Sequence, residues 1–264
     1  MSSEAELKSC CAAAYESDFA RLLLGGSFHP GGLALTARLG ERLALSARDR
    51  VLDVACGRGD SAIFIAQRFG CRVTGVDFGR ANIAEARSRA AEAQVAGLVR
   101  FEIGDAERLD YPDAGFEAVL CECAYCTFPD KGAAAREFMR VLAPGGRLGL
   151  SDLTRAGGLP AELSGLLAWI ACIGDARPEA EYVVQLEMAG FQSVSAEAHD
   201  DALAGMVRDI QARLLATELM VKLEKVSLPS VDFREANALA ASAAQAVRSG
   251  LLGYNLITAQ KPCA

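Results

Sequence analysis

"VLDVACGRGD", residues 51–60, joins a short apolar run to a turn that carries Gly57 and Gly59. The run up to Val54 has the length and composition of a buried β-strand, and the apolar residues after Asp60 have helical spacing. Glycines between a strand and a helix allow positive φ and a close approach of a ligand to the backbone. The stretch therefore predicts a strand–turn–helix unit that brings a ligand against its turn.

Short apolar runs alternate with helical stretches on both sides of this unit. Strands are predicted for residues 50–56, 72–78, 99–106, 116–124 and 147–153, and helices for residues 60–70, 80–97 and 131–146. Because consecutive parallel strands are joined by crossover helices, this alternation predicts an α/β fold with a doubly wound, mainly parallel sheet.

Mostly helical segments precede and follow this core. Helices are predicted for residues 4–24, 33–45, 159–172, 178–191, 200–224 and 233–249, and a closing strand for residues 253–261. We therefore expect one domain over residues 1–264, with a helical cap (1–47), a central core (48–155) and a helical carboxyl-terminal part (156–264). The last two helices are amphipathic and are expected to cover the sheet or form a dimer contact.

Composition excludes several classes of function. The 264 residues are 52% hydrophobic and carry a net charge of −7, which argues against a nucleic-acid surface. No apolar run reaches roughly 18 residues, so no membrane span is expected.

The amino end has acids where a secretory signal is basic and then apolar, which predicts a cytoplasmic protein. Nine cysteines, an odd number, fit a reducing compartment. Both a monomer and a homodimer are compatible with the sequence.

The spacing Asp53-x-Ala55-x-Gly57-x-Gly59 lacks the third glycine of a dinucleotide fingerprint. It resembles the first motif of class I S-adenosylmethionine (SAM) methyltransferases, acid-x-Gly-x-Gly-x-Gly, with an alanine in place of the first glycine. Acids also end the second and third predicted strands, and a Pro-Gly-Gly turn precedes the fifth, in the order of that family. The resemblance implies SAM as cofactor and an enzyme that transfers its methyl group.

Roles for individual residues follow from this resemblance. Asp77 ends its strand where a carboxylate accepts the ribose hydroxyls, as in other nucleotide folds. Asp105 stands where the family contacts the adenine amino group, and Glu122 would place an acid near the positive sulfonium. The cofactor-binding residues implied in this way are Asp53, Ala55, Gly57, Gly59, Asp77, Phe78, Asp105, Ala106 and Glu122.

"CECAYC", residues 121–126, places three thiols at the end of the fourth predicted strand, beside the expected methyl group. This region resembles arsenite methyltransferases, in which a cysteine stands six residues before a Pro-Asp-Lys-like turn, as Cys123 does before Pro129. A second arsenic-binding cysteine of that family corresponds to Cys172, eighteen residues before Gly190. The resemblance implies that both thiolates bind As(III) as substrate, since soft acceptors prefer thiolates. Methyl transfer to the arsenic lone pair then depends on positioning more than on a base.

Other thiols of the arsenite family are only partly present. Cys126 is a possible third ligand, a place that glutathione or water can also fill, and Cys10 and Cys11 stand near one of the family's amino-terminal thiols. Ser61 and the thiol-free "SFHPGG" (27–32) occupy two further cysteine positions. A redox relay through those positions is therefore in doubt.

Two other interpretations remain open. One is a UbiE-like methyltransferase of an organic small molecule, with Cys126 and His29 lining the acceptor site and His29 or Glu122 as base. The other is a SAM- or metalloid-binding protein that has lost the transfer step. Among the remaining candidates, His199 is expected on the surface after a strand, and the thiols expected as small core residues are Cys56, Cys71 and Cys121.

Overall fold

The computed structural model describes residues 8, 13, 16, 22–25, 28–163, 168, 172–228 and 231–263. The helix predicted for residues 4–24 lies largely outside this part, as does much of the one predicted for residues 159–172. Cys10 and Cys11 also lie outside the described residues.

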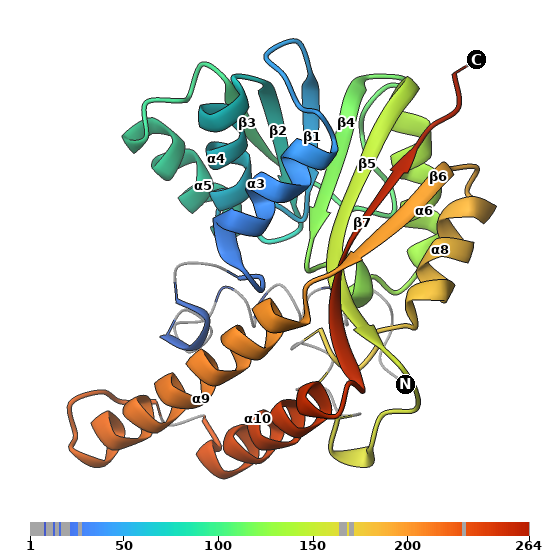
Figure 1. The fold of residues 1–264 in the computed structure, drawn as a ribbon. Coiled ribbons are helices and arrows are strands. Elements are labelled where there is room, and N and C mark those ends of the chain that lie inside the picture. The colour runs from blue at the N-terminus through green and yellow to red at the C-terminus, as the bar shows by residue number, and fades with distance from the viewer. Residues whose placement is uncertain are drawn as a thin grey trace.

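A seven-stranded sheet forms the centre of the protein, in the order β3-β2-β1-β4-β5-β7-β6 (Figure 1). The parallel strands β1 to β5 are Arg50–Val54, Arg72–Asp77, Val99–Ile103, Phe116–Glu122 and Leu142–Arg155. β7 (Leu252–Gln260) is antiparallel to its neighbours β5 and β6 (Gln192–Ala198). The predicted doubly wound, mainly parallel sheet is confirmed.

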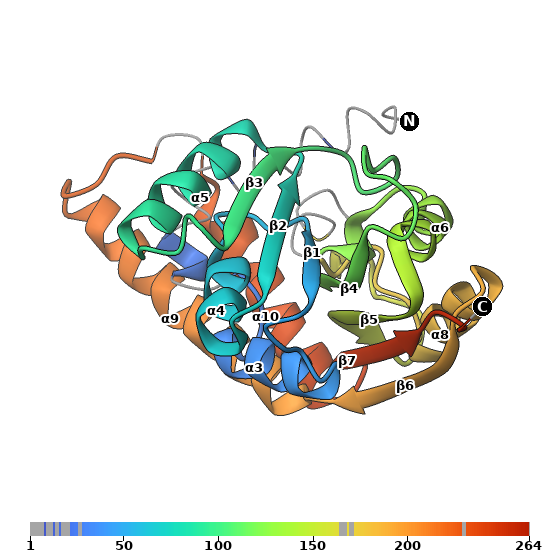
Figure 2. The same cartoon turned by 90° about the horizontal axis from the view of Figure 1, so that it is seen from above.

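Helices cover both faces of this sheet (Figure 2). On one face lie α3 (Gly32–Arg42), α4 (Asp60–Phe69) and α5 (Arg80–Glu92), and on the other lie α6 (Lys131–Val141) and α8 (Glu179–Met188). Each face buries its own apolar cluster, around Leu39 and Ile65 on the first and around Phe138 and Tyr182 on the second. Removal of this apolar surface from water is the main force that holds the layers together.

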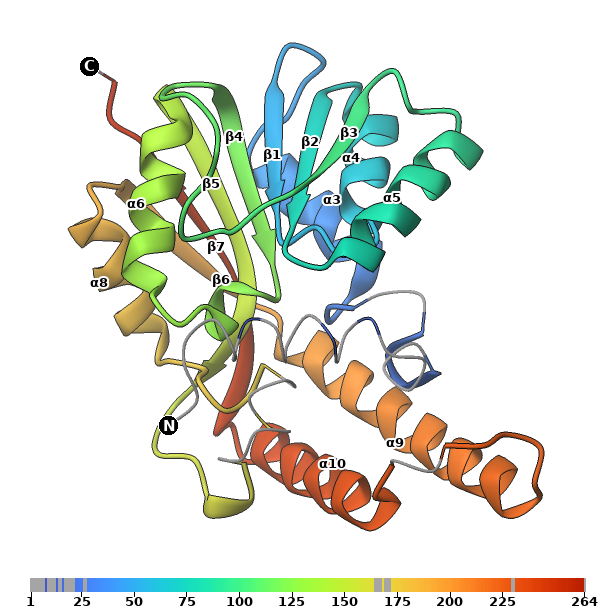
Figure 3. The same cartoon turned by 180° about the vertical axis from the view of Figure 1, so that it is seen from behind.

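The carboxyl-terminal helices lie beyond the ends of the strands and not over a face of the sheet (Figures 1 and 3). α9 (Asp200–Lys222) and α10 (Phe233–Arg248) pack against each other beyond the carboxyl ends of the parallel strands (Figures 1 and 3). A third buried cluster, which includes Leu153, Leu203 and Ala244, joins them to β5. They therefore close the end of the sheet at which an α/β protein binds its ligand.

Two 3₁₀ turns complete the described elements, η1 (Tyr125–Thr127) after β4 and η2 (Ala161–Leu163) after β5. No helix among the described residues is both long and apolar enough to cross a membrane.

The turn after β1 takes the left-handed conformation at three residues: φ is 57° at Ala55, 52° at Gly57 and 79° at Gly59. A Cβ atom on Gly59 would lie 2.5 Å from the Cζ atom of Phe101, whereas one on Gly57 would find no atom nearer than 3.7 Å. Gly59 is thus required by packing as well as by φ, and Gly57 leaves the backbone open toward a ligand.

Substitution of Gly59 tests this packing. Gly59→Ala should lower the free energy of unfolding by about 2–4 kcal/mol, because it adds left-handed strain to a clash with the Phe101 ring. Gly97→Ala is the matched control, since a Cβ there meets nothing within 4 Å, and it should change stability by no more than about 0.5 kcal/mol. Urea unfolding measures both, and equal effects in the two variants would contradict the assigned role of Gly59.

Candidate active site

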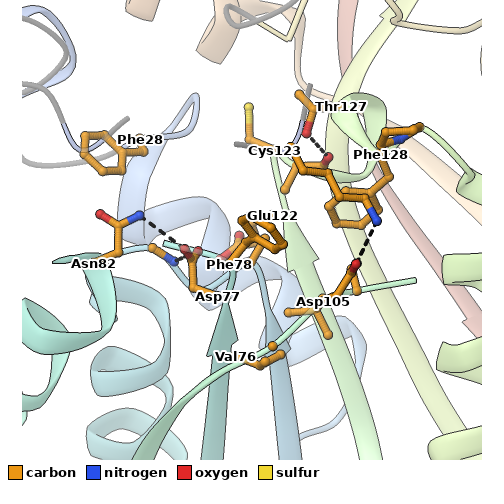
Figure 4. Close-up of a pocket in the computed structure, with 18 residues that line it drawn as sticks. Phe28, Val76, Asp77, Phe78, Asn82, Asp105, Glu122, Cys123, Thr127 and Phe128 are labelled. Atoms are coloured by element: carbon orange, nitrogen blue, oxygen red, sulfur yellow. Dashed lines mark hydrogen bonds and ion pairs between the residues drawn. The ribbon is translucent and has the colours of Figure 1, made fainter. Parts of the chain in front are cut away.

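A cavity of about 140 Å³ opens at the carboxyl ends of β1, β2 and β4 (Figure 4). It is called the cofactor cavity below. Its walls include most of the residues predicted to bind the cofactor, namely Ala55, Gly57, Asp77, Phe78, Asp105, Ala106 and Glu122. Asp53 and Gly59 are not among its lining residues and lie in the strand and turn behind it. The strand ends and turns thus gather residues that are up to 67 positions apart, from 55 to 122, around one space.

Asp77 accepts hydrogen bonds from three groups on the two sides of this cavity. Its Oδ2 accepts a hydrogen bond from the Gly57 N–H at 2.8 Å, and its Oδ1 accepts from the Gly79 N–H at 2.7 Å and from Asn82 Nδ2 at 3.2 Å. Burial raises the pKa of Asp77, and these three donors oppose the shift. One carboxylate therefore fixes the turn after β1, the end of β2 and the start of α5 relative to one another.

Two further acids lie nearby, Asp53 of β1 behind the cavity wall and Glu122, the last residue of β4, in the wall itself. The Asp53 side chain is buried, and its Oδ2 has no hydrogen-bond partner within the described structure. Glu122 accepts hydrogen bonds from the Ser61 hydroxyl at 2.6 Å and the Thr36 hydroxyl at 3.0 Å. Burial, followed by the charge of Glu122, raises the pKa of Asp53 well above its usual range. The raised pKa favours the neutral form of Asp53, so Glu122, which lines the cavity, is the acid of this pair that suits a ligand with positive charge, as SAM carries.

The far end of the cavity holds Asp105 and a residue that sequence reasoning missed, Lys8. Lys8 Nζ donates to both Asp105 carboxylate oxygens, at 3.0 and 2.8 Å, and to Glu107 Oε2 at 2.6 Å. Lys8 also lines the cavity. The contact spans 97 positions in the sequence, and no local pattern around Lys8 indicates such a distant partner.

The structure brings the predicted pair Cys123 and Cys172 together. Cys123 lines the cofactor cavity, and the buried Cys172 thiol donates to the Cys123 carbonyl oxygen with a separation of 3.2 Å. The Cys172 sulfur is also hydrogen-bonded to the thiols of Cys123 and Cys126. The bond to Cys172 and burial raise the pKa of Cys123, and burial and the same neighbour raise that of Cys126.

Asp152, another residue that sequence reasoning missed, lies beside these thiols. Its Oδ2 accepts from the Cys126 N–H at 2.8 Å and its Oδ1 from the Leu153 N–H at 2.8 Å. Burial, with the neighbouring Cys172, raises the pKa of Asp152 to about 7. In the described part of the chain, no group of three or more His, Cys, Asp or Glu residues is arranged to hold a metal ion.

Both residues proposed to line an acceptor site are buried and are not among the residues that line the cofactor cavity. His29 Nε2 lies 3.4 Å from the Thr36 hydroxyl and 3.9 Å from Glu122 Oε2. Cys126 is in η1. His199 directly follows β6 and contacts Glu197 Oε1 at 2.8 Å. As expected, Cys56, Cys71 and Cys121 are buried in the core.

These features together define an α/β protein that binds an adenosyl cofactor at its strand ends. A family model described as a methyltransferase domain matches residues 51–146. The chain is 32% identical to the 27-O-demethylrifamycin SV methyltransferase of Amycolatopsis mediterranei over 238 residues, which cover 86% of this chain and 83% of that protein. It is 45% identical to the demethylmenaquinone methyltransferase of Deinococcus radiodurans over 117 residues, 44% of this chain and 47% of that protein.

A solved structure has the same fold. Haemonchus contortus phosphoethanolamine N-methyltransferase 2, in complex with SAM, superimposes with a TM-score of 0.79 at 19% identity, over 97% of this chain and 60% of the other. The chain belongs to the class I SAM-dependent methyltransferases. It is an enzyme that uses SAM as its cofactor, as predicted, and its named relatives are small-molecule methyltransferases.

The buried Asp152 gives this site a measurable pH dependence. Carboxyls of unfolded chains have a pKa near 4, so between about pH 4 and pH 7 the folded protein retains a proton that the unfolded chain releases. Stability should therefore fall by about 1.4 kcal/mol for each unit of rising pH in this window, and Asp152 should add no slope above it.

Asp152→Asn isolates this contribution. Urea unfolding measures the free energy of unfolding of the wild type and the variant between about pH 4 and pH 7. The difference between the two proteins should change by about 1.4 kcal/mol for each pH unit. Parallel curves for the two proteins would show that Asp152 is ionised in the folded state throughout the window.

Proposed function

We propose that the protein transfers the methyl group of SAM to a hydroxyl of an organic small molecule. The similarity to the 27-O-demethylrifamycin SV methyltransferase carries this proposal, because it extends over 86% of the chain and not over residues 51–146 alone. It therefore includes segments outside the SAM-binding core, and such segments contact the acceptor in enzymes of this architecture.

The wall next to Cys123 supports an organic acceptor. It consists of Ala124, Thr127, Phe128 and Pro129, and the Thr127 hydroxyl already donates to the Ala124 carbonyl at 2.7 Å. A mainly apolar wall with one polar group that is already bonded suits the carbon skeleton of an organic molecule.

A hydroxyl acceptor needs a base, and we assign this role to Glu122 together with His29. Glu122 lines the cavity, and the Thr36 hydroxyl lies within 3.4 Å of His29 and 3.0 Å of Glu122. Glu122 takes the hydroxyl proton, and Thr36 and His29 provide a buried route along which it leaves the site. SAM, when bound, supplies the methyl group on a positively charged sulfur.

A second candidate acceptor is As(III), held by Cys123 and Cys172. The observation that favours it is the contact of the Cys172 sulfur with both other thiols. The raised pKa values of Cys123 and Cys126 weigh against it, because As(III) binds the thiolate form. Glutathione would supply a further thiol ligand in this case.

The location that we propose is the cytoplasm. The described cysteines are all free thiols, including the group at the end of β4, and a reducing compartment keeps them so.

Turnover with labelled SAM distinguishes the two acceptors. The purified protein is incubated with 27-O-demethylrifamycin SV, with a reduced demethylquinone, or with As(III) in the presence and absence of glutathione. We expect a labelled organic product, a loss of about 10²-fold in turnover for His29→Asn, and retained turnover for Cys123→Ser and Cys172→Ser.

His199→Asn is the matched control, since His199 pairs with Glu197 away from the cavity, and it should retain wild-type turnover. SAM binding by each variant shows whether its site is intact. Labelled arsenic without any labelled organic product, lost in Cys123→Ser and Cys172→Ser, would replace the proposal with the metalloid acceptor.

A further inference from the structure

Cys123 is a nucleophilic residue in the wall of the cavity that binds an alkylating cofactor. It lines the same space as Asp77 and Glu122, and Figure 4 shows its sulfur at the end of β4, directed away from the strand. A thiolate is a strong nucleophile, whereas a neutral thiol is a weak one. The protonation state of this cysteine therefore decides whether the enzyme methylates itself.

Such self-methylation is chemically complete without another reagent. A bond forms between the Cys123 sulfur and the methyl carbon of SAM as the bond from that carbon to the sulfonium breaks. The products are S-methylcysteine and S-adenosylhomocysteine, and the thiol proton passes to water. No acceptor molecule is needed.

The backbone brings Cys123 and Cys172 together at a cost in conformational energy. Both residues take left-handed conformations, with φ of 52° and 63°, which cost a non-glycine residue about 1–2 kcal/mol each. In return, the Cys172 thiol donates to the Cys123 carbonyl oxygen, and its sulfur accepts the proton of the Cys123 thiol. The Cys123 proton is thus engaged in a bond that a thiolate cannot make.

The groups behind this pair also disfavour negative charge on sulfur. The Cys126 thiol is hydrogen-bonded to the Cys172 sulfur, and the Asp152 carboxyl lies next to both and is 1% exposed. Its negative charge, when present, opposes ionisation of Cys123 and Cys126.

We propose that Cys172, with Cys126 and Asp152 behind it, holds the Cys123 sulfur as a hydrogen-bonded neutral thiol, so that the enzyme does not transfer the SAM methyl group to itself. Cys172 and Asp152 are then positioning residues that act through Cys123. The inference needs only SAM in the cofactor cavity and is independent of the proposed acceptor.

Incubation with methyl-labelled SAM and no acceptor tests the proposal. After digestion, peptide mass spectrometry measures S-methylation of Cys123, and the alkylation rate with iodoacetamide, without SAM, reports its thiolate fraction. The wild type should stay unmethylated. Cys172→Ala should raise the rates of S-methylation and of iodoacetamide alkylation of Cys123, each about tenfold for every unit by which the Cys123 pKa falls. Cys172→Ser should restore protection, because its hydroxyl still accepts the thiol proton.

Controls separate this effect from a loosened structure. Cys123→Ser combined with Cys172→Ala should carry no label, and Cys71→Ala, a buried cysteine in another cluster, should leave both rates unchanged. If Asp152→Asn folds and binds SAM, it should also raise both rates. The proposal is overturned if Cys172→Ala binds SAM yet shows wild-type rates, or if Cys172→Ser reacts as fast as Cys172→Ala.

Discussion

The cofactor side of this enzyme depends on the carboxylate of Asp77. Its two oxygens accept the N–H groups of Gly57 and Gly79 and the amide of Asn82. These donors belong to the turn after β1 and to the start of α5, so one side chain at the end of β2 fixes the backbone on both sides of the cavity. Without this acceptor, two backbone N–H groups, one in the turn after β1 and one at the start of α5, would lose their partner at a cost of about 1–3 kcal/mol each.

The two sides of the active site differ in chemistry because they are built on different strand ends. The side formed by β1 and β2 places the Asp77 carboxylate at the cavity and buries Asp53 behind it. The side formed by β4 and β5 gathers thiols and apolar residues, under α9 and α10. The contact with Cys172 and burial raise the pKa of Cys123, and burial and the same contact raise that of Cys126, which favours neutral thiols beside an alkylating cofactor.

Sequence reasoning identified the elements of the core because each has a local signal. The apolar runs, the glycine turn and the strand-end acids predicted β1 to β5, the crossover helices and the places of Asp77 and Asp105. The position of β7 between β5 and β6 was not predictable in this way, nor was the packing of α9 and α10 beyond the carboxyl ends of the parallel strands. Both depend on which apolar surfaces meet in three dimensions.

The same limit applies to the site. The resemblance indicated Cys123 and Cys172, which the fold brings together, but not their contact with Cys126 or Asp152. Lys8 and Thr36 reach acids 97 and 86 positions away, and neither residue has a local pattern that marks it.

Calorimetric titration of SAM into the wild type and Asp77→Ala tests the central claim most directly. The account predicts that the variant, if folded, binds SAM at least about tenfold more weakly, because a charged acceptor contributes about 1.5–3 kcal/mol. Asp113→Ala, which removes a carboxylate that is 79% exposed, should bind as tightly as the wild type. A folded Asp77→Ala variant with wild-type affinity for SAM would contradict the account.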